Sequence, residues 1–423
     1  MEYRKRIADT ILKDKLEAKG AVLIEGAKWC GKTTTARQAA ASVLYMQDPS
    51  QKKQNMLLAE VDASLLLKGG VPRLIDEWQL APKLWDAVRF EVDERNDFGQ
   101  FILTGSAVPS DGSAISHSGT GGIARMLMRP MSLFESGDSD GSVSLEELFN
   151  PDYIVSASSA IDIEKLAFLI CRGGWPQAVG RSERVALRQA FDYFDAVVYS
   201  DISRADGVSR DPERAKRLMR SFARGIGSQI KYEEIRKDML GNDIESFGIM
   251  TLYSYINALK SIFVIEDSPA WNPNLRSSTA VRSTDTRYFV DPSIAAASLG
   301  FGPKDLIRDL NTMGFMFENL CIRDLRVYAE SIDGSVYHYR DRNGLECDAV
   351  VHLRNGKYGL VEIKLGGDSL ISDGVESLNR LEKAIDTSKM PSPSFKMVLT
   401  GTGNYAYRQK DGICIVPIGC LKN

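Results

Sequence analysis

The stretch Val22–Thr34 reads VLIEGAKWCGKTT and places an apolar strand directly before the pattern GxxxxGK[ST]. Gly26 and Gly31 let the backbone curl so that successive N–H groups face a phosphate, Lys32 adds a positive charge, and the Thr33 hydroxyl suits Mg²⁺. A helix-forming stretch follows, so strand, loop and helix occur in the required order. We therefore expect a phosphate-binding loop (P-loop) that holds ATP. Its nucleotide-contacting residues are predicted to be Gly26, Ala27, Lys28, Trp29, Cys30, Gly31, Lys32, Thr33 and Thr34.

A second strand, residues 71–77 (VPRLIDE), ends in two acidic residues, although Pro72 and Arg73 interrupt its apolar run. Phosphoryl transfer depends on positioning and charge neutralisation more than on covalent chemistry. We expect Asp76 to hold Mg²⁺ together with Thr33. Glu77 is predicted to orient or deprotonate the attacking water.

A third strand, residues 100–106 (QFILTGS), has a polar end. Parallel sheets place their ligands at the carboxyl ends of their strands, so Thr104 and Ser106 are candidates to sense the γ-phosphate. The predicted catalytic set therefore includes Lys32, Glu77 and Thr104. For Trp29, stacking on the nucleotide base and shielding of the loop both stay open.

Composition limits the number of domains, the cellular location and the kinds of partner that we expect. The chain has 423 residues, of which 43% are apolar and 26% charged, enough for about three domains with their own cores. No apolar run approaches a membrane span, so a cytoplasmic protein is expected. The six cysteines have no CxxC spacing and are expected to be reduced and mostly buried. The net charge of −3 is near neutral, so any contact with nucleic acid would have to come from a local basic patch.

The segments GAKWCGKTT, IDEWQLAPKLWDAVR, GQFILTGSA and IARMLMRPMSLFE resemble bacterial and archaeal AAA-type P-loop ATPases that carry a C-terminal domain of unknown function. The resemblance covers the whole chain and implies ATP hydrolysis with Mg²⁺. It also implies that Arg125, or else Arg129, contacts the γ-phosphate as an arginine finger carried by the loop at residues 110–122. The alternative is a surface arginine. Whether Arg125 acts within its own subunit or on a neighbour in a homo-oligomer stays open.

Four domains are expected in this α/β multidomain chain: a P-loop ATPase domain with a parallel sheet at 1–136, a helical linker domain at 144–205, a winged-helix-like domain at 206–300 and a nuclease-like domain at 305–423. A polar, glycine-rich stretch at 136–142 marks the first boundary. The GGWP turn at 173–176 is interpreted as a structural helix stop. A long helix is expected from about Arg184 to Ile202.

The winged-helix prediction rests on three helices followed by two extended segments, 263–265 and 287–290. Such modules often read duplex DNA through the third helix. That helix carries a single Lys over 251–260, which is poor for phosphate contact. The region 204–237 has ten basic and five acidic residues, a net of +5, and is the better candidate for binding DNA or RNA. An ordinary solvated helix face is the simpler explanation of its arginine stripe. The stripe consists of Arg214, Arg217, Arg220 or Ser221, and Arg224.

The C-terminal segment contains Glu318 on an expected helix, Asp348 on a strand, and Glu362 and Lys364 on the next strand. This is the layout of PD-(D/E)xK nucleases, within an expected helix, three strands, helix and strand. Carboxylates suit Mg²⁺, and Lys364 would activate water. A two-residue turn at 355–356 would put Asp348 and Glu362 on opposite faces. We therefore predict a three-residue connection at 354–356 with Gly356 left-handed, setting Asp348 opposite Glu362.

Two functions follow from these patterns. The first is an Mg²⁺-dependent ATPase coupled to nucleic-acid binding or processing through the C-terminal domains. The second is an ATP-driven switch or assembly module whose nuclease-like domain does not cut and serves protein docking. The nucleic-acid type, the pathway and the oligomeric state stay open.

Overall fold

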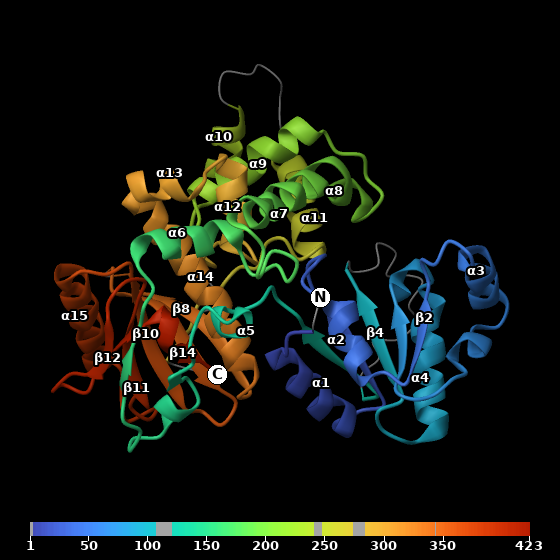
Figure 1. The fold of residues 1–423 in the computed structure, drawn as a ribbon, viewed down its shortest axis with the longest axis horizontal. Helices are drawn as coiled ribbons and strands as arrows, with labels where there is room; N and C mark the ends of the chain where they lie inside the picture. Colours follow the sequence, from blue (N-terminus) through green and yellow to red (C-terminus); the bar gives the residue numbers. More distant parts are fainter. Residues whose placement is uncertain (1–2, 107–120, 241–247, 274–283, 343) are drawn as a thin grey trace. The chain divides into compact units, whose positions relative to one another are not determined.

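The computed structural model describes residues 3–106, 121–240, 248–273, 284–342 and 344–423 (Figure 1). The chain divides into two units, each with its own sheet. The first unit contains Met1–Pro130, Tyr199–Arg210 and Ser254–Val264. The second unit contains Met131–Val198, Asp211–Tyr253 and Ile265–Asn423.

A five-stranded parallel sheet forms the first unit, in the order β2-β3-β4-β1-β5. Its strands are β1 (Ala21–Glu25), β2 (Ser42–Tyr45), β3 (Arg73–Asp76), β4 (Phe101–Gly105) and β5 (Ile123–Leu127). Its main helices are α1 (Ile7–Ala18), α2 (Lys32–Ala39), α3 (Lys52–Val61) and α4 (Lys83–Arg95). Because β4 lies between β1 and β3, the polar end of β4 separates the P-loop from the acidic strand end.

Helices cover both faces of this sheet, α1 and α2 on one side and α3 and α4 on the other (Figure 1). Successive strand residues point to opposite faces, so each strand supplies both cores. Val22 and Ile24 of β1 pack in the core that includes α1 and α2. Ala21 and Leu23 pack in the core that includes α4. This explains why β1 is apolar throughout instead of alternating.

Helices dominate the middle of the chain, as expected. They are α6 (Ile163–Arg172), α7 (Glu183–Ala196), α9 (Pro212–Arg224), α10 (Tyr232–Leu240), α11 (Ile249–Ser261), α12 (Pro292–Leu299) and α13 (Pro303–Arg308). The predicted helix at 184–202 corresponds to α7, a π-helical turn at Val197–Asp201 and α8 (Ile202–Arg204). After α11, an antiparallel bridge joins Ile265 to Phe289, within the two expected extended segments, and a second joins Ser268 to Thr286, just outside them.

A seven-stranded mixed sheet, in the order β7-β12-β13-β11-β10-β9-β8, forms the C-terminal part of the second unit. Its central elements are α14 (Leu310–Glu330), β8 (Gly334–Arg340), β9 (Glu346–Leu353), β10 (Tyr358–Lys364), α15 (Asp368–Ala384) and β11 (Phe395–Thr400). The predicted order of helix, three strands, helix and strand is thus confirmed. The added elements are α5 (Leu133–Ser136), β6 (Val143–Ser144), β7 (Ser156–Ser158), β12 (Tyr405–Arg408), β13 (Cys414–Pro417) and β14 (Leu421–Lys422).

The GGWP turn has a structural role, as interpreted from the sequence. Helix α6 ends at Arg172, and Gly173 continues in the left-handed region with φ of 70°. A Cβ atom on Gly174 would lie 2.1 Å from the carbonyl oxygen of Met131, so no other residue fits without a backbone shift. The Trp175 indole N–H donates to Ser293 Oγ at 2.9 Å. The turn therefore ties α6 to α12 and to the segment before α5.

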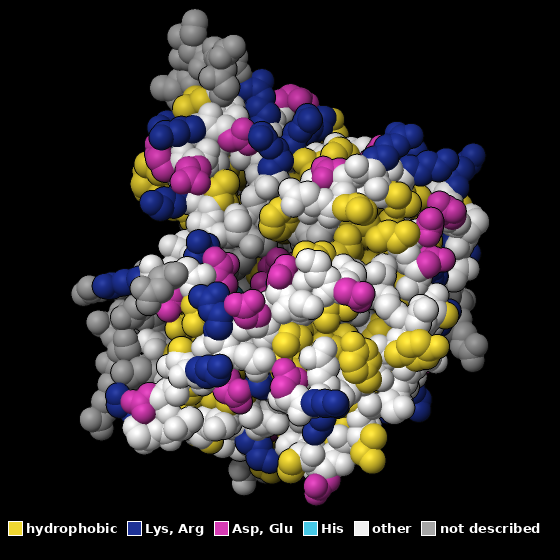
Figure 2. All heavy atoms as spheres, turned by 90° about the vertical axis from the view of Figure 1, so that its left-hand side faces the viewer, with side chains coloured by type: hydrophobic (Ala, Val, Ile, Leu, Met, Phe, Trp, Pro, Cys, Tyr) yellow, Lys and Arg dark blue, Asp and Glu magenta, His cyan; other side chains and the backbone are white. Residues whose placement is uncertain are grey.

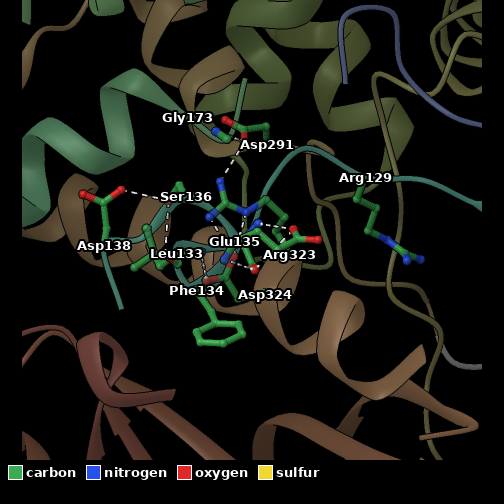
Figure 3. A network of polar contacts seen from close by, with 12 residues as sticks. Arg129, Leu133, Phe134, Glu135, Ser136, Asp138, Gly173, Asp291, Arg323 and Asp324 are labelled. Carbon is green, nitrogen blue, oxygen red and sulfur yellow. Dashed lines mark hydrogen bonds and ion pairs between the residues drawn. The ribbon is translucent and has the colours of Figure 1, made fainter. Parts of the chain in front are cut away.

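A buried ion cluster stands beside this turn (Figure 3). The Arg323 guanidinium contacts Asp291 at 2.8 Å and Asp324 at 2.7 Å, and all three side chains are buried. Asp291 also accepts the Gly174 N–H, and Asp324 accepts the Leu133 N–H, each at 2.9 Å. Buried charges require a partner and further hydrogen bonds, and this cluster supplies both. Arg323 therefore holds together segments far apart in the sequence.

Replacing Arg323 by leucine is expected to lower the free energy of unfolding of the second unit by about 3–5 kcal/mol, because two buried aspartates would lose their counter-ion. Urea denaturation of the full chain would measure the change. Arg188→Ala removes an exposed arginine that pairs with Asp192 on α7 and is expected to change stability by about 0.5 kcal/mol or less. A loss below about 1 kcal/mol in Arg323→Leu would contradict a structural role for the cluster.

All six cysteines are free and buried, which confirms the expected burial. In the described parts of the chain, no helix combines the length and the apolar character needed to span a membrane.

Candidate nucleotide site and nuclease-like cluster

The P-loop connects the end of β1 at Glu25 to the start of α2 at Lys32. Gly26 and Gly31 have positive φ values of 146° and 106°. A Cβ atom on Gly26 would lie 2.1 Å from the carbonyl oxygen of Met128, so the loop passes too close to the chain after β5 for any side chain there. The two glycines thus perform the backbone role predicted from the sequence.

Lys32 is buried at the start of α2. Its ammonium donates to the carbonyl oxygens of Gly26 and Ala27, both at 2.8 Å. A lysine ammonium has three N–H donors, so these bonds leave one for a ligand. The loop itself therefore fixes the position of the charge predicted to meet the phosphates.

Asp76, at the end of β3, accepts hydrogen bonds from residues of β4, of α2 and of the segment after β2. Its Oδ1 accepts the hydroxyl of Thr33 at 2.7 Å and that of Thr104 at 2.6 Å, while its Oδ2 accepts the Gln47 amide at 2.6 Å. Asp76 and Thr104 are paired in register on β3 and β4. The structure therefore brings together Thr33, Asp76 and Thr104 as the sequence predicted. Gln47 was missed, because a single glutamine two residues after a strand carries no distinctive signal.

Glu77 follows Asp76 in the left-handed region, with φ of 58°. It accepts the Gln79 amide at 2.5 Å and the Ser106 hydroxyl at 3.2 Å. Left-handed conformations of residues other than glycine are uncommon and gather at functional sites. The backbone strain and the two donors hold the Glu77 carboxylate at the end of β4, next to the Asp76 site. The sequence indicated Ser106 as a site residue but gave no indication of Gln79.

The chemistry of these side chains fits a magnesium ion. Mg²⁺ takes one or two carboxylates and completes its shell with phosphate oxygens and waters. The Asp76 carboxylate and the Thr33 hydroxyl, in contact with each other, provide such a pair. Among the described residues, no three His, Cys, Asp or Glu side chains are grouped to hold a metal ion. A Mg²⁺ ion held by this pair would take its remaining ligands from substrate oxygens and water.

The remaining loop residues have different surroundings. Cys30 is buried, with its Sγ 3.3 Å from the Met128 carbonyl oxygen. Lys28 forms a 2.6 Å ion pair with Asp201. Trp29 is 46% exposed and has a positive φ of 65°. The Thr34 carbonyl oxygen accepts the Gln38 amide. The exposed indole fits both interpretations of Trp29, stacking on a base and shielding the loop.

Arg125 lies within β5, opposite Leu23, and not beside Asp76. Its guanidinium is 3.4 Å from Glu25 and packs over the Trp85 ring, and the side chain is 57% exposed. Burial raises the pKa of Glu25, and Arg125 opposes this shift. The Arg129 carbonyl oxygen accepts the Arg6 guanidinium. Residues 110–120 of the predicted finger loop lie outside the described residues, so the arginine-finger role stays a prediction.

The hairpin between β9 and β10 has the predicted register. Leu353 and Lys357 close a three-residue connection, and Gly356 is left-handed with φ of 87°. The observed pairing of Val361 with Ala349, continued by one residue, sets Glu362 opposite Asp348. Directly opposed residues share one face of the sheet. The sequence prediction is confirmed on this point.

The three side chains at this position are in contact. Lys364 Nζ lies 2.6 Å from Glu362 and 3.3 Å from Asp348, and the Asp348 carboxylate also accepts the Ile363 N–H at 2.7 Å. Burial and the nearby Asp348 raise the pKa of Glu362 to about 8, although Lys364 opposes the shift. Burial tends to lower the pKa of Lys364, but the two carboxylates raise it above its ordinary value. Lys364 therefore stays protonated at neutral pH.

Glu318 is influenced electrostatically by Asp348, but its hydrogen bond is to a residue outside the Asp348, Glu362 and Lys364 cluster. Burial and Asp348 raise its pKa well above the ordinary value. Its carboxylate accepts the hydroxyl of Tyr288, a fully buried residue, at 2.5 Å. A Cβ atom on Gly227 would lie 3.1 Å from it. Tyr288, missed by the sequence reasoning, thus links the segment after α11 to the cluster. Direct metal contact by Glu318 stays a prediction.

Ion pairs occupy part of the basic region 204–237. Arg210 is buried, because its guanidinium bonds to Asp206 four residues earlier and to Ser254, so counting it as a surface charge was wrong. Lys216, Arg224 and Arg236 pair with acidic neighbours. Below the grey segment that follows α10, Figure 2 shows Lys and Arg side chains beside Asp and Glu side chains. Local ion pairing thus offsets much of the positive charge.

Three family models match successive parts of the chain. Residues 18–136 match an AAA domain, residues 163–305 match a domain of unknown function (DUF8612), and residues 313–421 match a second domain of unknown function (DUF4143). The chain therefore contains an AAA-type ATPase-like domain followed by these two domains. No curated protein matches the chain.

Similar solved structures include the following two. One is a Walker-type ATPase of Pyrococcus abyssi, 13% identical, with a TM-score of 0.43 over 70% of this chain and 96% of that chain. The other is the Orc1 protein of Aeropyrum pernix in complex with DNA, also 13% identical, with a TM-score of 0.26 over 73% of this chain and 95% of that chain.

Proposed function

We propose that this protein binds ATP at the P-loop and hydrolyses it with Mg²⁺. The observation that carries the proposal is the contact of Asp76 with both Thr33 and Thr104, beside the fixed ammonium of Lys32. These groups occupy the carboxyl edge of a parallel sheet, where such folds bind their ligands. The AAA family match over residues 18–136 supports the same function.

Each group has a role in the proposed reaction. The P-loop N–H groups and Lys32 bind the phosphates, and Asp76 and Thr33 would hold Mg²⁺, which would supply neutralisation of the phosphate charge. Glu77, oriented by Gln79 and Ser106, positions the attacking water and accepts its proton. Positioning and charge neutralisation are the main sources of rate in phosphoryl transfer, and this site provides both.

Phosphate release from ATP is expected to require Mg²⁺. Excess EDTA should reduce the rate to that of buffer, and added Mg²⁺ should restore it, because the carboxylate–hydroxyl pair alone cannot neutralise the phosphates. A coupled phosphate assay measures both states. Nucleotide binding without measurable single-turnover hydrolysis would instead indicate a binding module.

We further propose that the C-terminal domains act on nucleic acid, with a winged-helix-like middle and a PD-(D/E)xK-like domain. The arrangement of three helices followed by two antiparallel bridges supports the first assignment. The contact of Lys364 with Asp348 and Glu362 on one sheet face supports the second. Two carboxylates and substrate phosphates suffice as ligands for Mg²⁺, so these residues fit a metal-assisted nuclease.

Cleavage is tested with supercoiled plasmid and with single-stranded DNA in the presence of Mg²⁺. We expect nicking by the wild type and its loss in Lys364→Ala and Asp348→Ala, since either change removes a polar group at the cluster. Lys383→Ala on α15 is a matched lysine control. If the wild type binds nucleic acid without cutting it, the domain acts as a binding module. If it does neither, protein docking is favoured.

A further inference from the structure

A cavity of about 320 Å³ lies between the C-terminal end of α9 and the segment from the end of α12 to the first turns of α14. All of its lining belongs to the second unit. Its polar lining residues are Arg220, Arg224, Asn311 and Thr312, and its aromatic lining residues are Phe301 and Phe315. The lining side chains include two positive charges and no acidic group. The cavity therefore offers an apolar floor together with a site for an anion.

The two arginines differ in availability. Arg224 forms a 2.8 Å ion pair with Asp238. Arg220 is exposed one helical turn earlier and has no hydrogen-bond or ion-pair partner among the residues that the structure describes. An arginine guanidinium presents a planar set of donors that matches a phosphate group. Arg220 is thus the group in this cavity that is ready to bind an anion.

The aromatic wall is accessible from solvent. Phe315 is 40% exposed on α14, and Phe301 is half-buried beside it in the same lining. Proteins that bind single-stranded nucleic acid combine a positive path for the backbone with aromatic faces on which bases stack. The Asn311 amide adds a donor and an acceptor of the kind that contacts base edges.

We propose that this cavity binds one unstacked base of a single-stranded nucleic acid, with the base against Phe315 and an adjacent phosphate on Arg220. The volume is at the lower end of the range for small-ligand pockets, which suits one base and excludes a duplex. Bases within a duplex are stacked and paired and cannot reach such a wall. The inference rests on the proposed nucleic-acid role and does not depend on ATP hydrolysis.

The test uses the full-length protein and fluorescein-labelled oligomers of about twelve nucleotides, a length in the range of known single-strand sites. Anisotropy titrations compare oligo-dT, oligo-rU and a duplex of equal length at several salt concentrations. Both single strands are expected to bind at least about tenfold more tightly than the duplex. Phe315→Ala should weaken binding by about tenfold and leave the salt slope unchanged. Arg220→Ala should weaken binding and reduce the slope by about 0.7.

Matched controls separate local effects from damage to the fold. Phe90→Ala, an exposed phenylalanine on α4, and Arg188→Ala on α7 should bind as the wild type does. Phe315→Trp should retain binding, because it keeps an aromatic face. Three results would overturn the proposal. They are equal affinity for duplex and single strand, no binding of either single strand, and wild-type affinity in Phe315→Ala. If ATP hydrolysis persists in that case, the cavity assignment fails while the ATPase assignment stands.

Discussion

Replacing Lys32 by alanine is expected to lower the rate of ATP hydrolysis by on the order of 10²- to 10³-fold, the range seen when one preorganised charge or donor is removed from an active site. The ammonium is held by two loop carbonyls in a buried position, so no other side chain can take its place without rebuilding the loop. Steady-state phosphate release measures the loss.

The matched control is Lys83→Ala, which removes an exposed lysine from α4 that pairs with Glu60 in the same domain. It should retain the wild-type rate. Turnover that stays unchanged in Lys32→Ala would refute the assignment of the P-loop as the hydrolytic site. A matching loss in both variants would point to unfolding, which thermal denaturation would reveal.

Glu77→Gln is expected to reduce single-turnover hydrolysis by about 10²- to 10⁴-fold, the usual contribution of a general base. The amide has nearly the same shape as the carboxylate but cannot accept the proton of water. Because Glu77 lies beside the Mg²⁺ pair and not within it, ATP binding should persist. Rapid-quench measurement of ATP cleavage and titration with a fluorescent ATP analogue separate these two effects.

Glu60→Gln makes the same chemical change at an exposed position of α3 and should leave cleavage intact. Loss of ATP binding in Glu77→Gln would assign this residue to nucleotide or metal binding. An unaffected cleavage step would require a different water-positioning group, with Ser106 and Gln79 as the nearest polar side chains.

The nucleotide site was largely predictable from the sequence because its backbone requirements are local. Gly26 and Gly31 adopt conformations that glycine favours, and they lie at fixed distances from Lys32. Gln47 was not predictable, because its bond to Asp76 arises from the packing of strands distant in sequence. Gln79 was not predictable, because its bond to Glu77 forms within a turn in which Glu77 is left-handed. The position of Arg125 within β5 follows from parallel pairing with β1, which no local pattern revealed.

The C-terminal domain shows the same contrast. Turn length alone predicted the register that sets Asp348 opposite Glu362. In contrast, the packing inside α15 was not predictable, because this helix runs from Asp368 to Ala384 with Gly374 in its interior. A Cβ atom there would lie 3.4 Å from Glu362 and 3.3 Å from Val398, so this glycine allows close packing of helix on sheet. Strands β12 and β13 were missed because tertiary pairing defines such short strands.

The hydrogen bonds around Asp76 affect the thermodynamics of nucleotide binding. The side chains of Thr33, Thr104 and Gln47 are all hydrogen-bonded to this carboxylate. Ordering free side chains opposes association by about 0.5–1.5 kcal/mol for each group immobilised. Because the protein's own hydrogen bonds order these groups, we expect little conformational entropy to be lost there on binding. The free-energy barrier to occupancy should therefore come mainly from stripping water from the triphosphate and its cation.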